Sequence, residues 1–274
     1  MRVRIRHEIT QHFEPGSRNL SVTVRLTPRS HEGQFVQRWT LDLDSDCRLY
    51  PQEDAFGNLC HAFTVEGPAE KVAVMAEGEV ETTDTTGIVR GTVEPFPAAL
   101  YLRQTDLTHP TDDIIAFADA IARSKDPLIQ AHTLMVALHE AVSEGEGSAL
   151  GGPLAAADAL AAKKACSGGI AHVFTSAARH LGFPARHISG YLAVDDVGAA
   201  RHWAELHVPK IGWVAFDCGR NLCATENYVR LAVGLDALAV APLRSTGADC
   251  LEKVTACDGR APPRLAQAQS QSQN

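Results

Sequence analysis

The segment Cys166–Leu181 constrains this 274-residue chain most, because it has the pattern of a buried helix that begins at a cysteine. After it, Gly182 tolerates left-handed geometry and Pro184 prevents the helix from continuing. A cysteine at a helix start lies beside unpaired backbone N–H groups and the positive end of the helix dipole, which stabilise a thiolate. Cys166 is therefore a candidate nucleophile, and a small buried core residue is the alternative. The apolar residues recur at the spacing of one helical stripe, namely Ile170, Val173, Phe174, Ala177, Ala178 and Leu181.

The pattern after this helix predicts three consecutive strands, at residues 186–194, 202–208 and 212–217. His202 opens the second strand and Asp217 ends the third. A thiol on a helix, then an imidazole and a carboxylate on successive strands, is the order of a Cys-His-Asp nucleophilic triad. We expect the cysteine-led helix to pack on an antiparallel sheet that contains these strands.

Several longer stretches carry a resemblance to a known family. They read L-G-F-P-A-R-H-I-S-G-Y-L at 181–192, W-A-E-L-H-V-P-K-I-G-W at 203–213, F-D at 216–217, Y-V-R-L-A-V-G-L-D at 228–236 and, upstream, D-A-F-G-N at 54–58. Together they resemble the transglutaminase-like family of the bacterial type, which has a papain-like fold. The resemblance implies a thiol acyl-transfer or amide-hydrolysing protein that acts on a peptide or protein carboxamide without a cofactor. It also implies Cys166 as nucleophile, His202 as general base and Asp217 as the group that orients the imidazole.

The chain departs from the family pattern at two of these positions. The family reads G-V-C-Q-D-F-A-H into the helix and H-A-W-x-E on the middle strand. Aligned on the Ala-His pair of the helix, Ser167 rather than Cys166 occupies the nucleophile position. Aligned on the Trp and Glu of the strand, Arg201 rather than His202 occupies the histidine position. Only Asp217 stays in register, so Ser167 and Arg201 are the in-frame alternatives.

Strand periodicity gives the displaced histidine a predicted direction. Successive side chains of a strand point to opposite faces, so His202 shares a face with the apolar residues that follow it at alternate positions. We expect Arg201 to point towards the helix mouth and pair with Asp217, while His202 packs on the other side. A bulge near residues 199–201 would instead return His202 to the cleft. The first outcome predicts a catalytically inactive member that binds a peptide or protein, and the second an active thiol enzyme.

The rest of the chain divides into an N-terminal region, the transglutaminase-like domain and a tail. Residues 1–100 alternate apolar and polar side chains between turn signals, which predicts an antiparallel β sandwich or a curled sheet. Residues 108–260 hold the predicted helices and the core strands, so the whole chain is α+β. Residues 261–274 are rich in Pro, Gln, Ser and Ala, which is typical of a disordered tail.

Composition narrows the partners and the compartment. The net charge of −8 argues against nucleic acid as a partner, since phosphate binding needs a basic surface. No apolar run has the length of a membrane span, and the chain starts with alternating arginines, which predicts a cytoplasmic protein without membrane contact. Seven cysteines, an odd number without C-x-x-C spacing, fit reduced thiols and predict no metal site. The sequence leaves the oligomeric state open.

Overall fold

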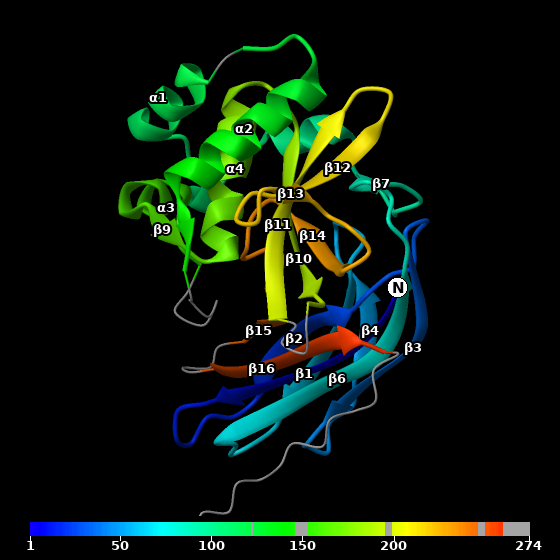
Figure 1. Ribbon diagram of the computed structural model, residues 1–274. Coiled ribbons are helices and arrows are strands. Elements are labelled where there is room, and N and C mark those ends of the chain that lie inside the picture. Colours follow the sequence, from blue (N-terminus) through cyan, green and yellow to red (C-terminus); the bar gives the residue numbers. More distant parts are fainter. Residues whose placement is uncertain (122, 146–152, 195–198, 246–249, 260–274) are drawn as a thin grey trace, which may run out of the picture.

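The computed structural model describes residues 1–121, 123–145, 153–194, 199–245 and 250–259 (Figure 1). It is an α+β fold in which an all-β region carries a second region of helices packed on an antiparallel sheet. The predicted tail at 261–274 lies outside the described residues.

The N-terminal region is a sandwich of two four-stranded antiparallel sheets, in the orders β16-β1-β6-β3 and β15-β2-β5-β4. Alternate side chains of β1, β2 and β6 are buried between the sheets, as the sequence pattern predicts. The core that results is aliphatic, with Ile5 and Val24 fully buried. The strands are β1 (Arg2–His12), β2 (Leu20–Thr27), β3 (Gln34–Leu43), β4 (Tyr50–Glu53), β5 (Leu59–Val65), β6 (Lys71–Thr82), β15 (Leu243–Arg244) and β16 (Cys250–Asp258).

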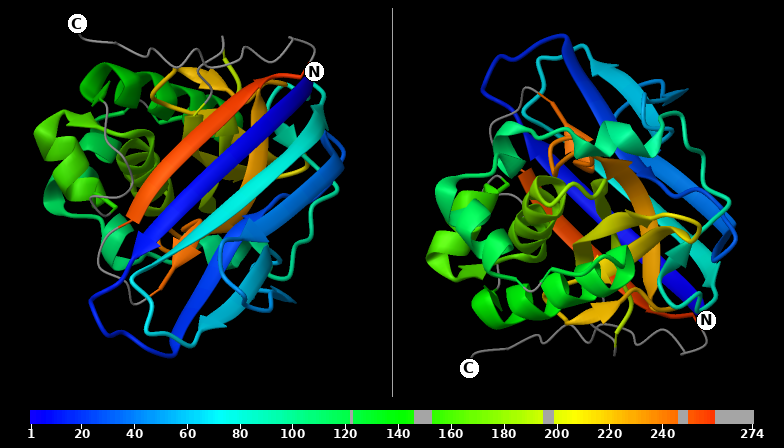
Figure 2. Two further views of the ribbon diagram at one scale, coloured as in Figure 1. Left: turned by 90° about the horizontal axis from the view of Figure 1, so that it is seen from below. Right: turned by 90° about the horizontal axis from the view of Figure 1, so that it is seen from above.

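The chain returns to this sandwich after it has built the second region. Strand β16 pairs antiparallel with β1 over the whole of its length, and Figure 2 shows it as the outer strand beside β1 and β6. Strand β15 pairs with β2 in the other sheet. The predicted domain 108–260 assigned these residues to the second region. Their alternating pattern allows either sheet, so only the pairing with β1 and β2 decides it.

The described residues of the second region form four helices, which pack against a six-stranded antiparallel sheet in the order β13-β12-β11-β10-β14, with β7 pairing to β12. Helix α4 lies on the face where Ala204, Leu206 and Val208 are buried, and it contributes Phe174 and Ala177 to that core. This arrangement is the papain-like packing that the sequence predicts. Its elements are α1 (Asp112–Ala120), α2 (Pro127–Ala141), α3 (Ala156–Ala162), α4 (Ser167–His180), β7 (Ile88–Val89), β10 (Ala185–Leu192), β11 (Ala199–Val208), β12 (Gly212–Asp217), β13 (Leu222–Cys223) and β14 (Tyr228–Gly234), with the short parallel pair β8 (Ser143–Glu144) and β9 (Lys164–Ala165) before α4 and the 3₁₀ turns Ala98–Leu102 and Asp106–Thr108 before α1.

The D-A-F-G-N turn joins the two regions. The Asp54 carboxylate accepts hydrogen bonds from the backbone N–H groups of Phe56 and Asn58, each at 3.0 Å, which fixes the turn. The Asn58 amide then donates to the carbonyl of Val233 and accepts from its N–H, both at 2.8 Å. A buried amide that satisfies both backbone groups of one β14 residue holds this strand against the sandwich.

Candidate functional site

Cys166 is the N-cap residue of helix α4, with extended backbone angles of φ −69° and ψ 168°. Its carbonyl accepts the first helical hydrogen bond from the N–H of Ile170, at 3.1 Å. The N–H groups of the first turn have no partner within the helix, so they are available to a developing negative charge. A Cβ at Gly169 would lie 3.0 Å from the Cβ of Ala165, which explains why this turn needs a glycine to pack closely.

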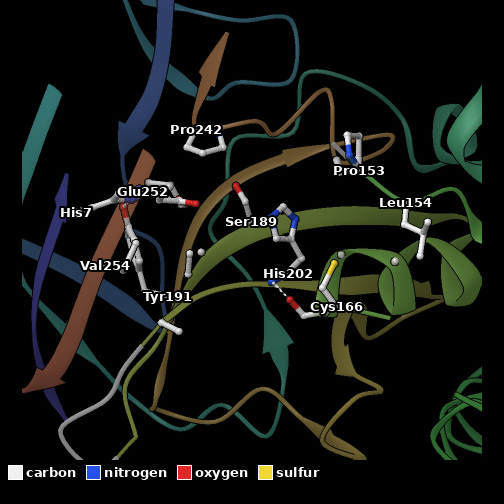
Figure 3. A pocket seen from close by; sticks show the side chains of 18 residues that line it. His7, Pro153, Leu154, Cys166, Ser189, Tyr191, His202, Pro242, Glu252 and Val254 are labelled. Carbon is white, nitrogen blue, oxygen red and sulfur yellow. Dashed lines mark hydrogen bonds and ion pairs between the residues drawn. The ribbon is translucent and has the colours of Figure 1, made fainter. Parts of the chain in front are cut away.

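A cavity of about 370 Å³ opens at this helix mouth (Figure 3). Cys166 and His202 both contribute to its wall. A Cβ built at Gly168 would lie 3.7 Å from His202 Cγ and 3.8 Å from Cys166 Sγ, so the thiol and the imidazole flank the same open position. The described lining residues are His7, Pro153, Leu154, Cys166, Ser167, Gly168, Gly169, Ser189, Gly190, Tyr191, Ala199, Ala200, His202, Leu231, Ala237, Pro242, Glu252 and Val254.

The direction predicted for His202 is wrong, although the predicted periodicity is right. Strand β11 pairs residue for residue with β10 and contains no bulge in this pairing. His202 therefore shares the face of Ala204 and Leu206, as expected. That apolar face is the one on which helix α4 packs, and the cavity lies at its end. The error was to assign the helix mouth to the other face of the strand.

The predicted contact between Arg201 and Asp217 is present and is bidentate. Arg201 Nη2 donates to Asp217 Oδ1 at 2.7 Å, and its Nε donates to Oδ2 of the same carboxylate. Glu144, on β8, accepts from the remaining nitrogen, Nη1, at 2.6 Å and from Nη2, which it shares with Asp217, at 2.9 Å. Burial disfavours the charged guanidinium, but the hydrogen bonds and charges of Asp217 and Glu144 outweigh it and raise the pKa of Arg201. The guanidinium is thus held as a permanent cation between two carboxylates.

Asp217 is satisfied by this cluster and leaves no oxygen for His202. The Tyr228 hydroxyl donates to its Oδ2 at 2.7 Å, and the N–H of Arg220 donates to Oδ1 at 3.3 Å. The structure therefore does not join Cys166, His202 and Asp217 into one chain of hydrogen bonds. Cys166 and His202 lie together at the cavity, while Asp217 lies with Arg201 on the opposite face of the sheet.

His187, on β10, takes the position next to His202 that an acid occupies in a triad. The distance from His187 Nε2 to His202 Nδ1 is 2.8 Å. Burial lowers the pKa of His202 to about 4, with His172 and Arg201 acting in the same direction and Glu252 opposing the shift. Burial also lowers the pKa of His187 well below its ordinary value. Both rings are therefore neutral at neutral pH.

A third imidazole completes the row behind His187. The His172 ring lies 4.6 Å from that of His187, centroid to centroid. Its Nδ1 donates to the carbonyl of Leu154 at 2.7 Å, and its Nε2 accepts from the N–H of Ala237 at 3.0 Å. These two backbone partners define one neutral tautomer, because each nitrogen has a fixed role. His172 thus holds the segments on either side of the cavity.

Ser167, the in-frame alternative to Cys166, also lies at the cavity. Its hydroxyl accepts a hydrogen bond from the backbone N–H of His202 at 3.2 Å, which ties the start of α4 to β11. The imidazole of His202 makes its bond to His187 instead.

Sequence reasoning missed His187, Glu144, Tyr228 and Glu252. His187 lies in the strand predicted at 186–194. The one sequence feature that could have pointed to it is the alternation of this strand, which puts a histidine on the cavity face. Glu144 and Glu252 come from segments that the sequence does not connect to the cysteine, so only the tertiary structure brings them close. In the described residues, no group of three or more His, Cys, Asp or Glu side chains is arranged to hold a metal ion. Among the same residues, no helix is long and apolar enough to cross a membrane.

A helix led by a cysteine and packed on an antiparallel sheet defines the fold of the papain-like thiol enzymes. Residues 115–218 match the transglutaminase-like superfamily, and residues 3–81 match the bacterial transglutaminase-like N-terminal region. The chain belongs to the transglutaminase-like superfamily.

The chain is also similar to an uncharacterised protein and to solved structures of bacterial proteins. An uncharacterised protein of Mycobacterium leprae, ML0607, is 25% identical over 261 residues, which cover 89% of this chain and 92% of that protein. The crystal structure of a "putative cysteine protease" from Cytophaga hutchinsonii is similar with a TM-score of 0.74 at 15% identity, over 96% of this chain and 93% of the other. The periplasmic domain of TgpA from Pseudomonas aeruginosa has a TM-score of 0.40 at 14% identity, over 78% of this chain and 90% of that domain. At these identities, the Cytophaga structure supports the fold alone.

Proposed function

We propose that this protein is a thiol enzyme that cleaves or transfers the acyl group of a peptide or protein amide, with Cys166 as nucleophile and His202 as proton carrier. The observation that carries the proposal is that the thiol and the imidazole line one cavity at the mouth of α4, on either side of the open position next to Gly168. Nucleophilic catalysis needs this pairing of a thiol with a base.

The reaction follows from the groups around the cavity. Cys166 Sγ attacks the carbonyl carbon, and the thiol proton passes to His202. The oxygen that becomes negative is stabilised by the free backbone N–H groups of the first turn of α4. His202 then returns the proton to the leaving amine as the C–N bond breaks, and a thioester to Cys166 remains. Water or a second amine attacks the thioester, and the thiol is restored.

Asp217 has no part in this proposal. Its two oxygens are bound by Arg201 and Tyr228, so its contribution is to hold β11, β12 and β14 together. The hydrogen bond from His187 to His202 supports His187 as the residue that orients the imidazole.

A second function, peptide binding without catalysis, is favoured by one specific observation. A pKa of about 4 makes His202 a weak base at neutral pH. Under this alternative the Cys166 cavity binds its ligand and releases it unchanged.

Mass spectrometry of the protein after incubation with peptide carboxamides tests the two functions. The enzyme forms a thioester on Cys166 that hydroxylamine removes, and the Cys166→Ala variant forms none. Thiol labelling gives an independent measurement of how reactive Cys166 is. Burial raises the pKa of the Cys218 and Cys250 thiols, whereas Cys166 is half-buried and lies at a cavity. We expect iodoacetamide to label Cys166 before these two thiols. Ligand binding without any thioester or product would contradict the enzyme and support the binding protein.

A further inference from the structure

The Cys166 cavity adjoins a second cavity of about 210 Å³. The two share His202 and Glu252 in their walls, so a chain bound over His202 reaches both. In Figure 3, Glu252 lies on the far side of His202 from Cys166, with Ser189 near the line between them. The acid comes from β16, which belongs to the N-terminal sandwich, so both regions of the fold build the cleft.

Glu252 gives this cleft a negative charge. It is the one carboxylate among the described residues that line the two cavities, and no lysine or arginine is among them. Burial disfavours the charged carboxylate, but the hydrogen bond of His7 opposes this and the pKa of Glu252 is lowered. Glu252 is therefore an anion at neutral pH, while His202 beside it is neutral.

His7, the partner of Glu252, can make both of its side-chain contacts with a single proton on its ring. His7 Nε2 lies 2.8 Å from Glu252 Oε1, and His7 Nδ1 lies 3.0 Å from the hydroxyl of Tyr191. A neutral imidazole satisfies both contacts, because Nε2 donates to the carboxylate and Nδ1 accepts from the hydroxyl. His7 and Tyr191 thus fix the carboxylate in place and leave its charge to act on the cleft.

The lining of the second cavity is mostly apolar, and its polar side chains besides Glu252 are those of Gln11 and His202. Ile9, Leu238 and Leu243 contribute large aliphatic side chains to it. A cavity of this size and lining suits one aliphatic side chain of a bound peptide. The cleft therefore has a thiol, then an anion, then an apolar subsite along one path.

We propose that Glu252 selects substrates with a basic side chain near the reacting carbonyl, followed by an apolar residue that enters the second cavity. The ligand class is a peptide segment with Lys or Arg next to an aliphatic residue. This inference rests on the proposed function for the location of the reacting carbonyl. The binding preference itself is independent of turnover, because it depends on Glu252 and the apolar wall alone.

Fluorescence anisotropy of labelled peptides with the Cys166→Ala variant tests the preference without catalysis. Three peptides that differ only at one position, with lysine, its neutral isostere norleucine or glutamate before a leucine, isolate the charge. We expect the lysine peptide to bind about tenfold more tightly than the norleucine peptide, because one buried charge-assisted contact is gained. Added salt should reduce this difference.

The double variant Cys166→Ala, Glu252→Gln is the matched control. Gln still accepts the hydrogen bond from His7 but carries no charge, and circular dichroism and thermal unfolding check that it folds. The double variant should bind the lysine and norleucine peptides equally, and its affinity for the norleucine peptide should equal that of the Cys166→Ala variant. Equal binding of these two peptides before the substitution, or a lysine preference that survives it, would overturn the inference. A preserved preference with no thioester on the wild-type protein would contradict the enzyme and leave this binding site supported.

Discussion

The imidazoles of His187 and His202 are joined by a hydrogen bond of 2.8 Å between Nε2 of the first and Nδ1 of the second. No hydrogen-bond partner for Nδ1 of buried His187 is present in the described part of the chain. A neutral imidazole has one N–H, and a buried N–H without a partner costs about 1–3 kcal/mol. The proton of His187 is therefore favoured on Nε2, from which it donates to His202. His202 then has its own proton on Nε2, and must exchange tautomers with His187 before it can accept the thiol proton.

This hydrogen bond predicts a specific response to substitution of His187. Gln places its amide near the position of the imidazole Nε2 and can donate or accept, so His187→Gln should keep the rate of thioester formation within a few-fold. His187→Leu removes the hydrogen bond, and we expect a loss of about tenfold in kcat, the equivalent of ~1.4 kcal/mol, with little change in KM. ¹⁵N NMR of the imidazoles reports the tautomer directly, with the proton of His202 on Nε2 in the wild type.

Equal rates for the two His187 variants would remove His187 from the mechanism. A proton on Nδ1 of His202 in the wild-type spectrum would contradict the tautomer argument, and leave His202 ready to act as a base.

Substitution of Asp217 should have the opposite effect to substitution of His187. We expect it to lower the free energy of unfolding and to leave the reactivity of Cys166 unchanged, although Asp217 occupies a position of the family triad. Asp217→Asn leaves Arg201 with only Glu144 as a charged partner, and breaking a buried ion pair typically costs about 3–5 kcal/mol. Tyr228→Phe, the matched control, removes one hydrogen bond to the same carboxylate and should cost about 1 kcal/mol. Urea unfolding measures both. The rate of Cys166 labelling should not change in either folded variant. A stable Asp217→Asn protein that has lost its turnover would instead assign Asp217 a catalytic role.

The fold was predictable because its signals are local. The stripe of apolar residues in α4 and the glycine and proline after it mark one buried helix, and the alternating strands identify the sheet. The D-A-F-G-N turn was visible in the sequence, but its contact with Val233 depends on a strand 175 residues later. Pairing between segments so far apart is not specified by local pattern.

Of the residues at the site, only Cys166 and His202 could be predicted from the sequence. The spacing identified Cys166 at the helix start, and strand periodicity put His202 and Arg201 on opposite faces. Periodicity does not say which face a helix will cover, so the side of the cavity was assigned wrongly. His187 lies next to His202 on the neighbouring strand, and Glu252 comes from the sandwich region. No spacing in the sequence encodes either of these neighbours.

Acid should destabilise the protein through its buried histidines. Burial lowers the pKa of both His202 and His31 to about 4, from 6.5. The unfolded chain therefore binds more protons between these pH values, so stability is full above pH 6.5 and is lost as the pH falls towards 4. Between pH 7 and 5, each group should reduce the free energy of unfolding by up to about 2 kcal/mol. Urea unfolding at both pH values measures the fall, which His202→Gln and His31→Gln should each make smaller. Variants with the same pH dependence as the wild type would show that these two groups do not titrate as described.

A methyl group at Gly168 provides the sharpest steric test of the site. Its Cβ would meet His202 and Cys166 at 3.7 and 3.8 Å, which is ordinary van der Waals contact, so Gly168→Ala should fold without strain. Because Ala favours a helix more than Gly, the free energy of unfolding should stay equal or rise by up to about 1 kcal/mol. The methyl group occupies the open position between thiol and imidazole, so thioester formation should fall at least about tenfold.

The control for this substitution is Gly182→Ala, at the other end of the same helix. Gly182 has a φ of +87° and nothing within 4 Å of its added Cβ, so alanine there is strained without any contact to the cavity. It should lower the free energy of unfolding by about 1 kcal/mol and leave thioester formation unchanged. The two variants thus separate stability from activity in opposite directions. Full activity in a folded Gly168→Ala protein would mean that the reacting carbonyl does not bind between Cys166 and His202.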